Sequence, residues 1–264
     1  MTGAPQTDRI VARKDGAIGW LVFNSPERRN AVSLEMWQAI PAVLADFEAD
    51  PRIRVVVLTG AGDKAFASGA DISQFEKDRS TAEGVQRYEQ RSDAAASRLQ
   101  SLDKPTLAMI RGYCLGGGLA IANLCDLRIA AEDARFGIPA AKMGLGYRAP
   151  AMKNLVELVG AAFAREIMIT ARQFSAAEAL HMGLVHKVVP VAELEAATRQ
   201  VCDTIAANAP LTIRAAKRVI REVTKGDYDA AACRAWVKEC FDSEDYAEGR
   251  RAFMEKRKPV FKGS

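Results

Sequence analysis

A chain of 264 residues, of which 49% are hydrophobic and 27% charged, can bury a large core, which excludes an intrinsically disordered protein. Its formal net charge of +4 is too small to indicate nucleic-acid binding. We find no signal-peptide core or membrane-spanning run, and the five cysteines form no CxxC pair, so we expect a cytoplasmic protein without a disulfide framework.

The first two hundred residues predict strands that alternate with helices. Residues 8–24 alternate around Asp15-Gly16 like a β-hairpin, and Ser33 is placed to cap a following amphipathic helix. Continuous apolar runs, which are typical of strands covered on both faces, predict four further strands at residues 55–60, 106–110, 127–130 and 185–189. Helical patterns occupy residues 81–102 and 155–167.

Towards the C-terminus the pattern becomes helical. Ser175 and Glu178 form a capping-box pattern before a short helix that Gly183 closes, and every segment after Pro190 is predicted to be helical. This order favours an α/β fold with a mostly parallel sheet and a C-terminal helical appendage. We therefore expect a core in residues 1–199 and a helical region in residues 200–264.

The most informative stretch runs from Ile110 to Asp126. The strand predicted at residues 106–110 is followed by three glycines, residues 116–118, and a helix begins directly behind them. A helix start leaves backbone N–H groups unpaired, so such a turn suits a phosphate or a thioester oxyanion. From Ile110 to Cys125 there is no Asp, Glu or His, so this stretch offers electrostatic stabilisation without an acid–base side chain.

Five motifs occur in an order that extends over essentially the whole chain. They lie at residues 24–33 (NSPERRNAVS), 55–72 (VVVLTGAGDKAFASGADI), 112–146 (GYCLGGGLAIANLCDLRIAAEDARFGIPAAKMGLG), 174–190 (FSAAEALHMGLVHKVVP) and 248–261 (EGRRAFMEKRKPVF). Together they resemble the enoyl-CoA hydratase/isomerase, or crotonase, superfamily. The resemblance implies ββα units wound around a mostly parallel sheet, a C-terminal helical trimerisation region, and a homo-trimer or hexamer.

The resemblance also implies a site for a CoA thioester. The backbone N–H groups that bind the thioester oxygen match Ala70 and Gly117, although a lone glycine turn can also be purely structural. Coenzyme A enters as part of an acyl-CoA substrate, with no permanently bound cofactor. The implied CoA contacts are Phe66, Ala67, Ser68, Ala70 and Ile72 along the adenine and pantetheine path, Arg28 and Arg29 near the phosphates, and Phe253 and Lys256 at the adenine and 3′-phosphate, often from a neighbouring subunit. For the basic residues among them, a solvated surface is the alternative.

Two acids expected from the resemblance are absent. Hydratases of the family carry one glutamate two residues after the glycines and another after the FGxP proline, where this chain has Ala120 and Ala140. Methyl side chains can neither activate water nor protonate carbon. No Asp or Glu occurs between Arg135 and Asn154. Hydration therefore requires a non-standard residue.

Tyr147, in the sequence GLGY, resembles the corresponding tyrosine of methylmalonyl-CoA decarboxylase, a crotonase-fold relative. Decarboxylation of a malonyl-type CoA ester forms the enolate directly, so the oxyanion hole holds it while a tyrosine orients the carboxylate or supplies a proton. Lys142 or Arg148 can hold the substrate carboxylate. That relative has a histidine where this chain has Ala70, and Tyr147, Lys142 and Arg148 can instead be surface residues.

Three functions remain open from the sequence. The preferred one is an acid-independent CoA-thioester lyase, and the alternatives are an enoyl-CoA hydratase of the fatty-acid β-oxidation type and a CoA-ester-binding protein without chemistry. We expect no metal site, because the two histidines, His181 and His186, are five residues apart and miss the i,i+4 ligand spacing.

Overall fold

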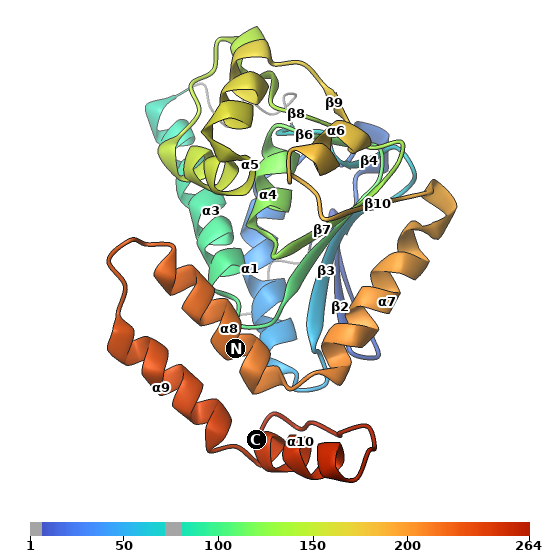
Figure 1. Ribbon diagram of the computed structural model, residues 1–264. Coiled ribbons are helices and arrows are strands. Elements are labelled where there is room, and N and C mark those ends of the chain that lie inside the picture. The colour runs from blue at the N-terminus through green and yellow to red at the C-terminus, as the bar shows by residue number, and fades with distance from the viewer. Residues whose placement is uncertain (1–6, 72–80) are drawn as a thin grey trace.

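In the computed structural model, which describes residues 7–71 and 81–264, the long strands form one six-stranded sheet (Figure 1). Its order is β1 (Ile10–Asp15), β2 (Ile18–Phe23), β3 (Val55–Gly60), β5 (Thr106–Ile110), β7 (Leu127–Ala131) and β10 (Lys187–Val189). The β1–β2 hairpin is antiparallel, and the other neighbours are parallel. The predicted hairpin and the mostly parallel sheet are confirmed.

A second sheet of four short strands was not predicted. Its order is β4 (Ala65–Ala67), β6 (Tyr113–Leu115), β8 (Arg135–Gly137) and β9 (Phe174–Ser175). The strand directly before the glycines is therefore β6, and the expectation that residues 106–110 lead straight into them was wrong. Each long strand of the series β3, β5 and β7 is followed by one short strand, which gives the expected ββ succession before each helical segment.

Helices cover both faces of the large sheet. On β3, Val56 and Leu58 point into the core shared with α1 (Leu34–Ala49), α3 (Ala82–Ser101), α4 (Gly117–Leu124) and α5 (Ala149–Thr170). Val55 and Val57 point into the other core, with Leu194 and Cys202 of α7 (Leu194–Ala207). This explains why the strand is apolar at successive positions. Short 3₁₀ helices occupy Pro26–Arg28 (η1), Pro139–Met143 (η3) and Val191–Glu193 (η4).

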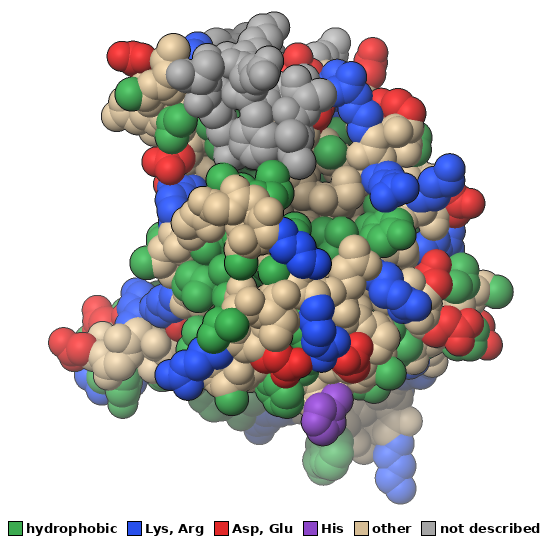
Figure 2. Space-filling view, turned by 90° about the horizontal axis from the view of Figure 1, so that it is seen from above, with side chains coloured by type: hydrophobic (Ala, Val, Ile, Leu, Met, Phe, Trp, Pro, Cys, Tyr) green, Lys and Arg blue, Asp and Glu red, His purple; other side chains and the backbone are tan. Residues whose placement is uncertain are grey.

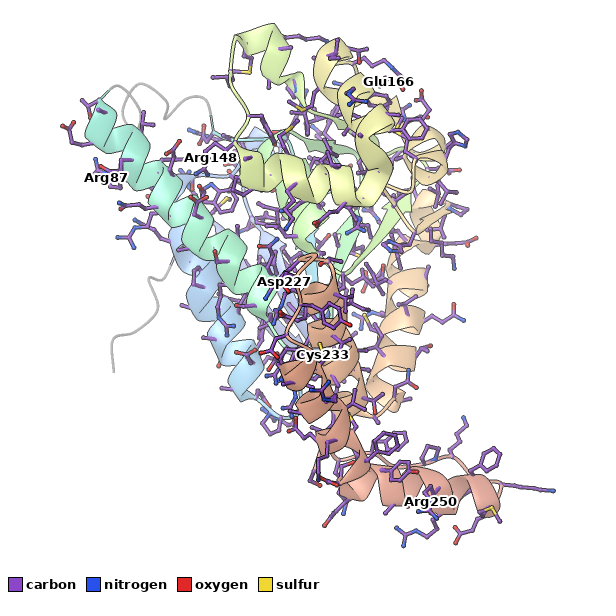
Figure 3. All side chains as sticks on the ribbon, turned by 60° about the vertical axis from the view of Figure 1, so that its left-hand side comes forward. Arg87, Arg148, Glu166, Asp227, Cys233 and Arg250 are labelled. Carbon is purple, nitrogen blue, oxygen red and sulfur yellow. The ribbon has the colours of Figure 1, made fainter. Side chains whose placement is uncertain are left out.

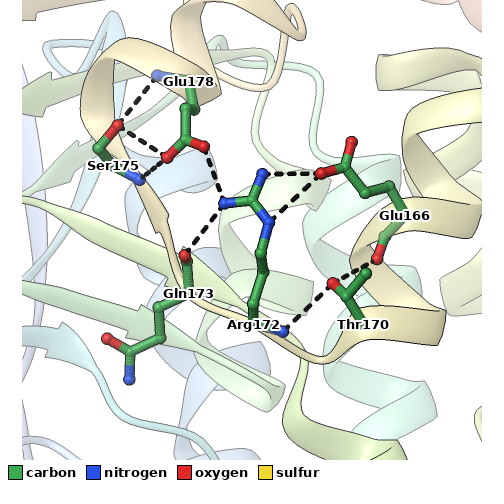
Figure 4. Close-up of polar contacts among 6 residues, drawn as sticks. All are labelled: Glu166, Thr170, Arg172, Gln173, Ser175 and Glu178. Carbon is green, nitrogen blue, oxygen red and sulfur yellow. Dashed lines mark hydrogen bonds and ion pairs between the residues drawn. The ribbon is translucent and has the colours of Figure 1, made fainter.

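The predicted capping box begins α6 (Ala176–His181), as Figure 4 shows. The Ser175 hydroxyl accepts from the Glu178 N–H at 3.2 Å, while the Glu178 carboxylate accepts from the Ser175 N–H at 2.7 Å. Arg172 donates to Glu166 of α5 at 2.7 Å and to Glu178 at 2.8 Å. We call Glu166, Arg172, Ser175 and Glu178 the Arg172 cluster. It fastens the end of α5 to the start of α6.

Three further helices follow at the C-terminus: α8 (Pro210–Val223) lies against the core, and α9 (Ala230–Phe241) and α10 (Glu244–Met254) extend away from it (Figure 1). Arg218 pairs with Asp103, and Lys217 with Asp126, which attaches α8 to the core. The boundary expected between residues 199 and 200 falls inside α7, where Cys202 is buried against the sheet. Large apolar side chains remain exposed on these helices, among them Ile220, Phe241, Phe253 and Met254.

The surface carries charges of both signs. On the face seen in Figure 2, basic and acidic side chains are interspersed with apolar ones. None of the helices in residues 7–71 and 81–264 combines the length and apolar character that a membrane span requires.

Candidate active site

Two backbone N–H groups, those of Ala70 and Gly117, lie close to each other at the glycine turn, Gly116–Gly118. The Val32 N–H donates to the Gly69 carbonyl, and the Asp71 N–H donates to the Val32 carbonyl, so the N–H of Ala70 faces away from Val32. Gly117 is the first residue of α4, where the helix provides no acceptor for its N–H. Within the described part of the chain, we find no acceptor for either group. A Cβ at Gly117 would lie 3.6 Å from the Ala70 nitrogen, so the two segments are in contact.

The packing of α4 explains why this turn requires glycine. Gly116 has φ +50°, a backbone conformation that side chains other than glycine rarely adopt. At Gly118 a Cβ would lie 2.2 Å from the Ala67 carbonyl oxygen of β4, so only hydrogen fits there. The start of α4 is therefore fixed against the segment that ends in Ala70. This arrangement suits an oxyanion, because donors held in advance need no reorganisation when charge develops.

The two alanines that stand where hydratases carry glutamates lie on segments next to the turn. Ala120 is in the first turn of α4, and its N–H donates to the Gly116 carbonyl at 3.0 Å. Ala140 is buried in η3, directly after Pro139, whose Cδ would lie 3.9 Å from a Cβ at Gly116. In residues 7–71 and 81–264 we find no carboxylate hydrogen-bonded to the turn.

Tyr147 reaches the turn from the loop before α5. Its hydroxyl lies 3.4 Å from the Gly116 carbonyl oxygen, and its ring packs against the main core. Burial, with a smaller contribution from Tyr88, raises the pKa of Tyr147 to about 12. The hydroxyl is therefore protonated at neutral pH and well above it. Tyr88 itself accepts from the Trp37 indole N–H at 2.8 Å.

The two candidates for holding a substrate carboxylate have different surroundings. Lys142 is exposed in the last turn of η3. Arg148 donates from both terminal nitrogens to Asp93 of α3, each at 2.7 Å, and Figure 3 shows it between α3 and the start of α5. This hydrogen bonding raises the pKa of Arg148 further. The structure thus brings Tyr147 to the glycine turn but directs Arg148 towards α3.

Some predicted CoA contacts cluster near Ala70. The Ser68 N–H donates to the Arg29 carbonyl at 3.0 Å, and Arg28 pairs with Asp71 at 2.9 Å. The Arg29 guanidinium lies over the Tyr113 ring at 5.0 Å. The Arg28 guanidinium therefore lies beside the segment that carries Ala70, whereas the Arg29 guanidinium points to the start of β6.

The other predicted CoA contacts present no described side chain at the turn within one chain. Phe66 is 1% exposed and packs edge-on against Phe23 at 5.5 Å, and Ala67 is fully buried, so only the backbone of β4 can reach a ligand. Ile72 lies outside the described residues. Phe253, which is 81% exposed, is near the end of α10 and Lys256 follows that helix, and Figure 1 shows α10 at the bottom of the molecule, away from α4. Within one chain, these two residues do not reach the turn.

Sequence reasoning missed the partners on α3. Asp93 and Ser92 contact Arg148, which is 55 and 56 residues away, so no local pattern connects them. Trp37 and Tyr88 are separated by 51 residues. The apolar stripe of α1 identified Trp37 only as a core residue. Among the described residues, no three His, Cys, Asp or Glu side chains gather as metal ligands do.

Comparisons with known proteins extend over nearly the whole chain. A family model described as enoyl-CoA hydratase/isomerase matches residues 13–264. A short-chain-enoyl-CoA hydratase of Clostridium acetobutylicum is 35% identical over 255 residues, which cover 96% of this chain and 97% of the relative. A carnitinyl-CoA dehydratase of Salmonella typhi is 32% identical over 259 residues, covering 95% and 97%. The solved structure of an enoyl-CoA hydratase/carnitine racemase from Magnetospirillum magneticum has a TM-score of 0.95 at 36% identity, covering 98% of this chain and 97% of the other. The fold predicted from the motifs is confirmed.

Proposed function

Because this chain belongs to the enoyl-CoA hydratase/isomerase family, whose members process acyl-CoA thioesters, we propose that it is a lyase that decarboxylates a malonyl-type CoA ester. One observation carries the proposal. Two N–H donors, Ala70 and Gly117, converge at a turn whose neighbouring positions, Ala120 and Ala140, carry methyl groups. This combination stabilises an enolate but supplies neither acid that hydration needs.

In the proposed reaction, the bond between the α-carbon and the substrate carboxylate breaks and CO2 leaves. The electron pair of that bond forms the enolate, whose oxygen accepts hydrogen bonds from the N–H groups of Ala70 and Gly117. The α-carbon then takes a proton from the Tyr147 hydroxyl, which water reprotonates. Lys142 is the better contact for the departing carboxylate, because both terminal nitrogens of Arg148 already bind Asp93.

The CoA portion follows the basic segment beside Ala70. Arg28 and Arg29 contact its phosphates, and the backbone of β4 with Ser68 borders the pantetheine. Phe253 and Lys256 reach the adenine and the 3′-phosphate from a neighbouring subunit of a homo-trimer or hexamer. The exposure of Phe253 and Met254 on α10 supports an assembly of this kind. The enzyme needs no permanently bound cofactor, and its five free cysteines support a cytoplasmic location.

Hydration of an enoyl-CoA is the second candidate. The names of the relatives favour it, since the first two described above are called a hydratase and a dehydratase. On this chain it would depend on Tyr147, or on a carboxylate outside the described residues, to activate water. A protein that binds CoA esters without turnover is the third outcome.

An assay panel distinguishes these functions. The purified protein is offered methylmalonyl-CoA and crotonyl-CoA, and binding of acetyl-CoA is measured in parallel. We expect CO2 release from methylmalonyl-CoA and no rapid hydration of crotonyl-CoA. Rapid hydration that survives Tyr147→Phe would refute the decarboxylase proposal, and tight binding without turnover would favour the third outcome.

A further inference from the structure

The loop that carries Tyr147 is anchored at few points. Residues 141–146, which comprise the end of η3 and the loop after it, are all exposed, and the N–H groups of Gly144 and Leu145 both donate to the Ala140 carbonyl. The loop is next held at Tyr147, by its 3.4 Å contact with Gly116, and at Arg148. An exposed loop with few contacts of its own takes its position from such anchors.

Arg148 makes the stronger of these last two contacts. Its terminal nitrogens donate to the two oxygens of Asp93 at 2.7 Å each, and one of them also lies 3.3 Å from the Ser92 hydroxyl. The Glu89 carboxylate also lies 3.9 Å from the Arg148 Nε. A bidentate arginine–carboxylate pair fixes orientation as well as distance, which a single ion pair does not. Since Arg148 follows Tyr147 directly, the pair restricts the backbone position from which the Tyr147 side chain extends.

Helix α3, which carries Asp93, is itself held in place by contacts with α1. Tyr88 lies one turn before Ser92 on the same face of α3, and its hydroxyl is held by the Trp37 indole N–H of α1. Arg98, further along α3, pairs with Glu48 of α1. The rings of Tyr88 and Tyr147 pack against the same core as Trp37. The part of α3 that binds Arg148 is therefore held against α1 and the core.

We propose that Arg148 is a positioning residue, which by pairing with Asp93 holds the Tyr147 hydroxyl at the glycine turn. This inference rests on the proposed role of Tyr147 as proton donor. It differs from a direct contact between Arg148 and the substrate carboxylate, because both terminal nitrogens are already engaged by Asp93. The two roles predict opposite results when the charges of the pair are exchanged.

The test compares Arg148→Glu, Asp93→Arg and the double variant that carries both changes. Each single variant should lower kcat about fivefold with KM unchanged, because an exposed pair contributes little and the tyrosine remains present. The double variant should recover at least half of the wild-type kcat. Lys153→Glu is the matched control, because it reverses a charge on α5 and breaks an exposed pair with Glu157. It should keep the wild-type kcat.

A second measurement does not depend on turnover. Amide hydrogen exchange of residues 144–148 should speed up in both single variants and return to the wild-type rate in the double variant, with similar Tm values throughout. If Arg148 instead holds the substrate, the double variant will stay impaired and KM will rise. Single variants with wild-type kcat, or recovery of exchange without recovery of kcat, would also overturn the proposal. If the wild-type protein turns over no ester, the proposed function fails, and the exchange data alone then decide whether the pair holds the loop.

Discussion

The glycine turn and the Arg172 cluster lie on opposite sides of one short strand, β8. The turn offers backbone groups, whereas the cluster consists of charged side chains. On one side, the Gly137 carbonyl accepts from the Gly116 N–H at 2.8 Å. On the other, the Arg172 carbonyl oxygen would lie 2.7 Å from a Cβ at Gly137. The turn presents backbone N–H groups bordered by methyl groups, whereas the cluster joins one arginine to two glutamates.

We infer that the glycine turn serves the reaction, whereas the Arg172 cluster contributes to stability. The side chains of Arg172 and Glu178 are 41% and 42% exposed, so water competes with their ion pair and it contributes little. The donors of the turn are fixed by strand and helix packing and cost no rearrangement when charge appears. We therefore expect changes at the turn to affect activity and changes at the cluster to affect stability alone.

The largest effect is expected from Gly117→Pro. Proline is tolerated at the first position of a helix, because the N–H it removes has no partner in the helix. Loss of one oxyanion donor should lower kcat by about 10²–10³-fold, with a Tm close to that of the wild type. Steady-state kinetics and thermal unfolding measure the two quantities.

The control for that variant is Gly117→Ala, which keeps the N–H and adds a methyl group 3.6 Å from the Ala70 nitrogen, an ordinary contact distance. It should retain at least about ten times the kcat of the proline variant. A folded Gly117→Pro protein with nearly wild-type kcat would mean that this N–H plays no part in the reaction.

Tyr147→Phe should have a smaller effect. The substitution removes the proton donor but keeps the ring that packs against the core. We expect kcat to fall at least about tenfold, less than a general acid can contribute, since water can still protonate the enolate. Single-turnover measurements should show that CO2 release is retained. If kcat and product protonation were unchanged in Tyr147→Phe, Tyr147 would contribute only to packing.

The pH dependence tests the same residue without a substitution. Because the pKa of Tyr147 is raised to about 12, the protonated donor form persists as pH rises past the ordinary tyrosine value of 10. The kcat should therefore change less than about twofold between pH 7 and pH 10 on account of this group. An inflection near pH 10 that disappears in Tyr147→Phe would contradict the raised pKa. Circular dichroism at each pH controls for unfolding.

Arg172→Ala should have the smallest effect on activity. We expect an unchanged kcat and a Tm lower by on the order of 2 °C, because the ion pairs it removes are exposed. The hydrogen bond from the Ser175 N–H, followed by that from Arg172, lowers the pKa of Glu178 to about 2. The stability from this carboxylate is thus present above pH 4.5 and lost as the pH falls towards 2. A marked loss of kcat would show that β8 couples the two regions.

The long strands could be predicted from sequence and the short ones could not. The run of residues 55–60 is apolar at successive positions because each face of β3 meets a different core. The strands of the second sheet have three residues or two, too few for a periodicity to register, and pairing between distant segments holds them. Strand pairing decides to which face of the sheet the Phe66 side chain points, so its burial could not be predicted from the local sequence.

The candidate site divides in a similar way. Ala70 and Gly117 were identified by ordered motifs, and the structure brings the segments that carry them into contact. Tyr147 was identified by its position in a motif. The contact between Arg148 and Asp93 spans 55 residues and joins a loop to a helix whose sequence is unremarkable there, so only the folded chain reveals it.

The proposed oxyanion hole is common to every reaction considered, and the carbonyl of a bound thioester would report on it directly. Isotope-edited infrared spectra of acetyl-CoA labelled at the thioester carbonyl should show the C=O stretch at lower wavenumber on the wild-type protein than in water. The Gly117→Pro variant should bind the same ester with most of this shift lost. A wild-type spectrum identical to that in water, or a shift that persists undiminished in the variant, would contradict the assignment of Ala70 and Gly117 as the donors.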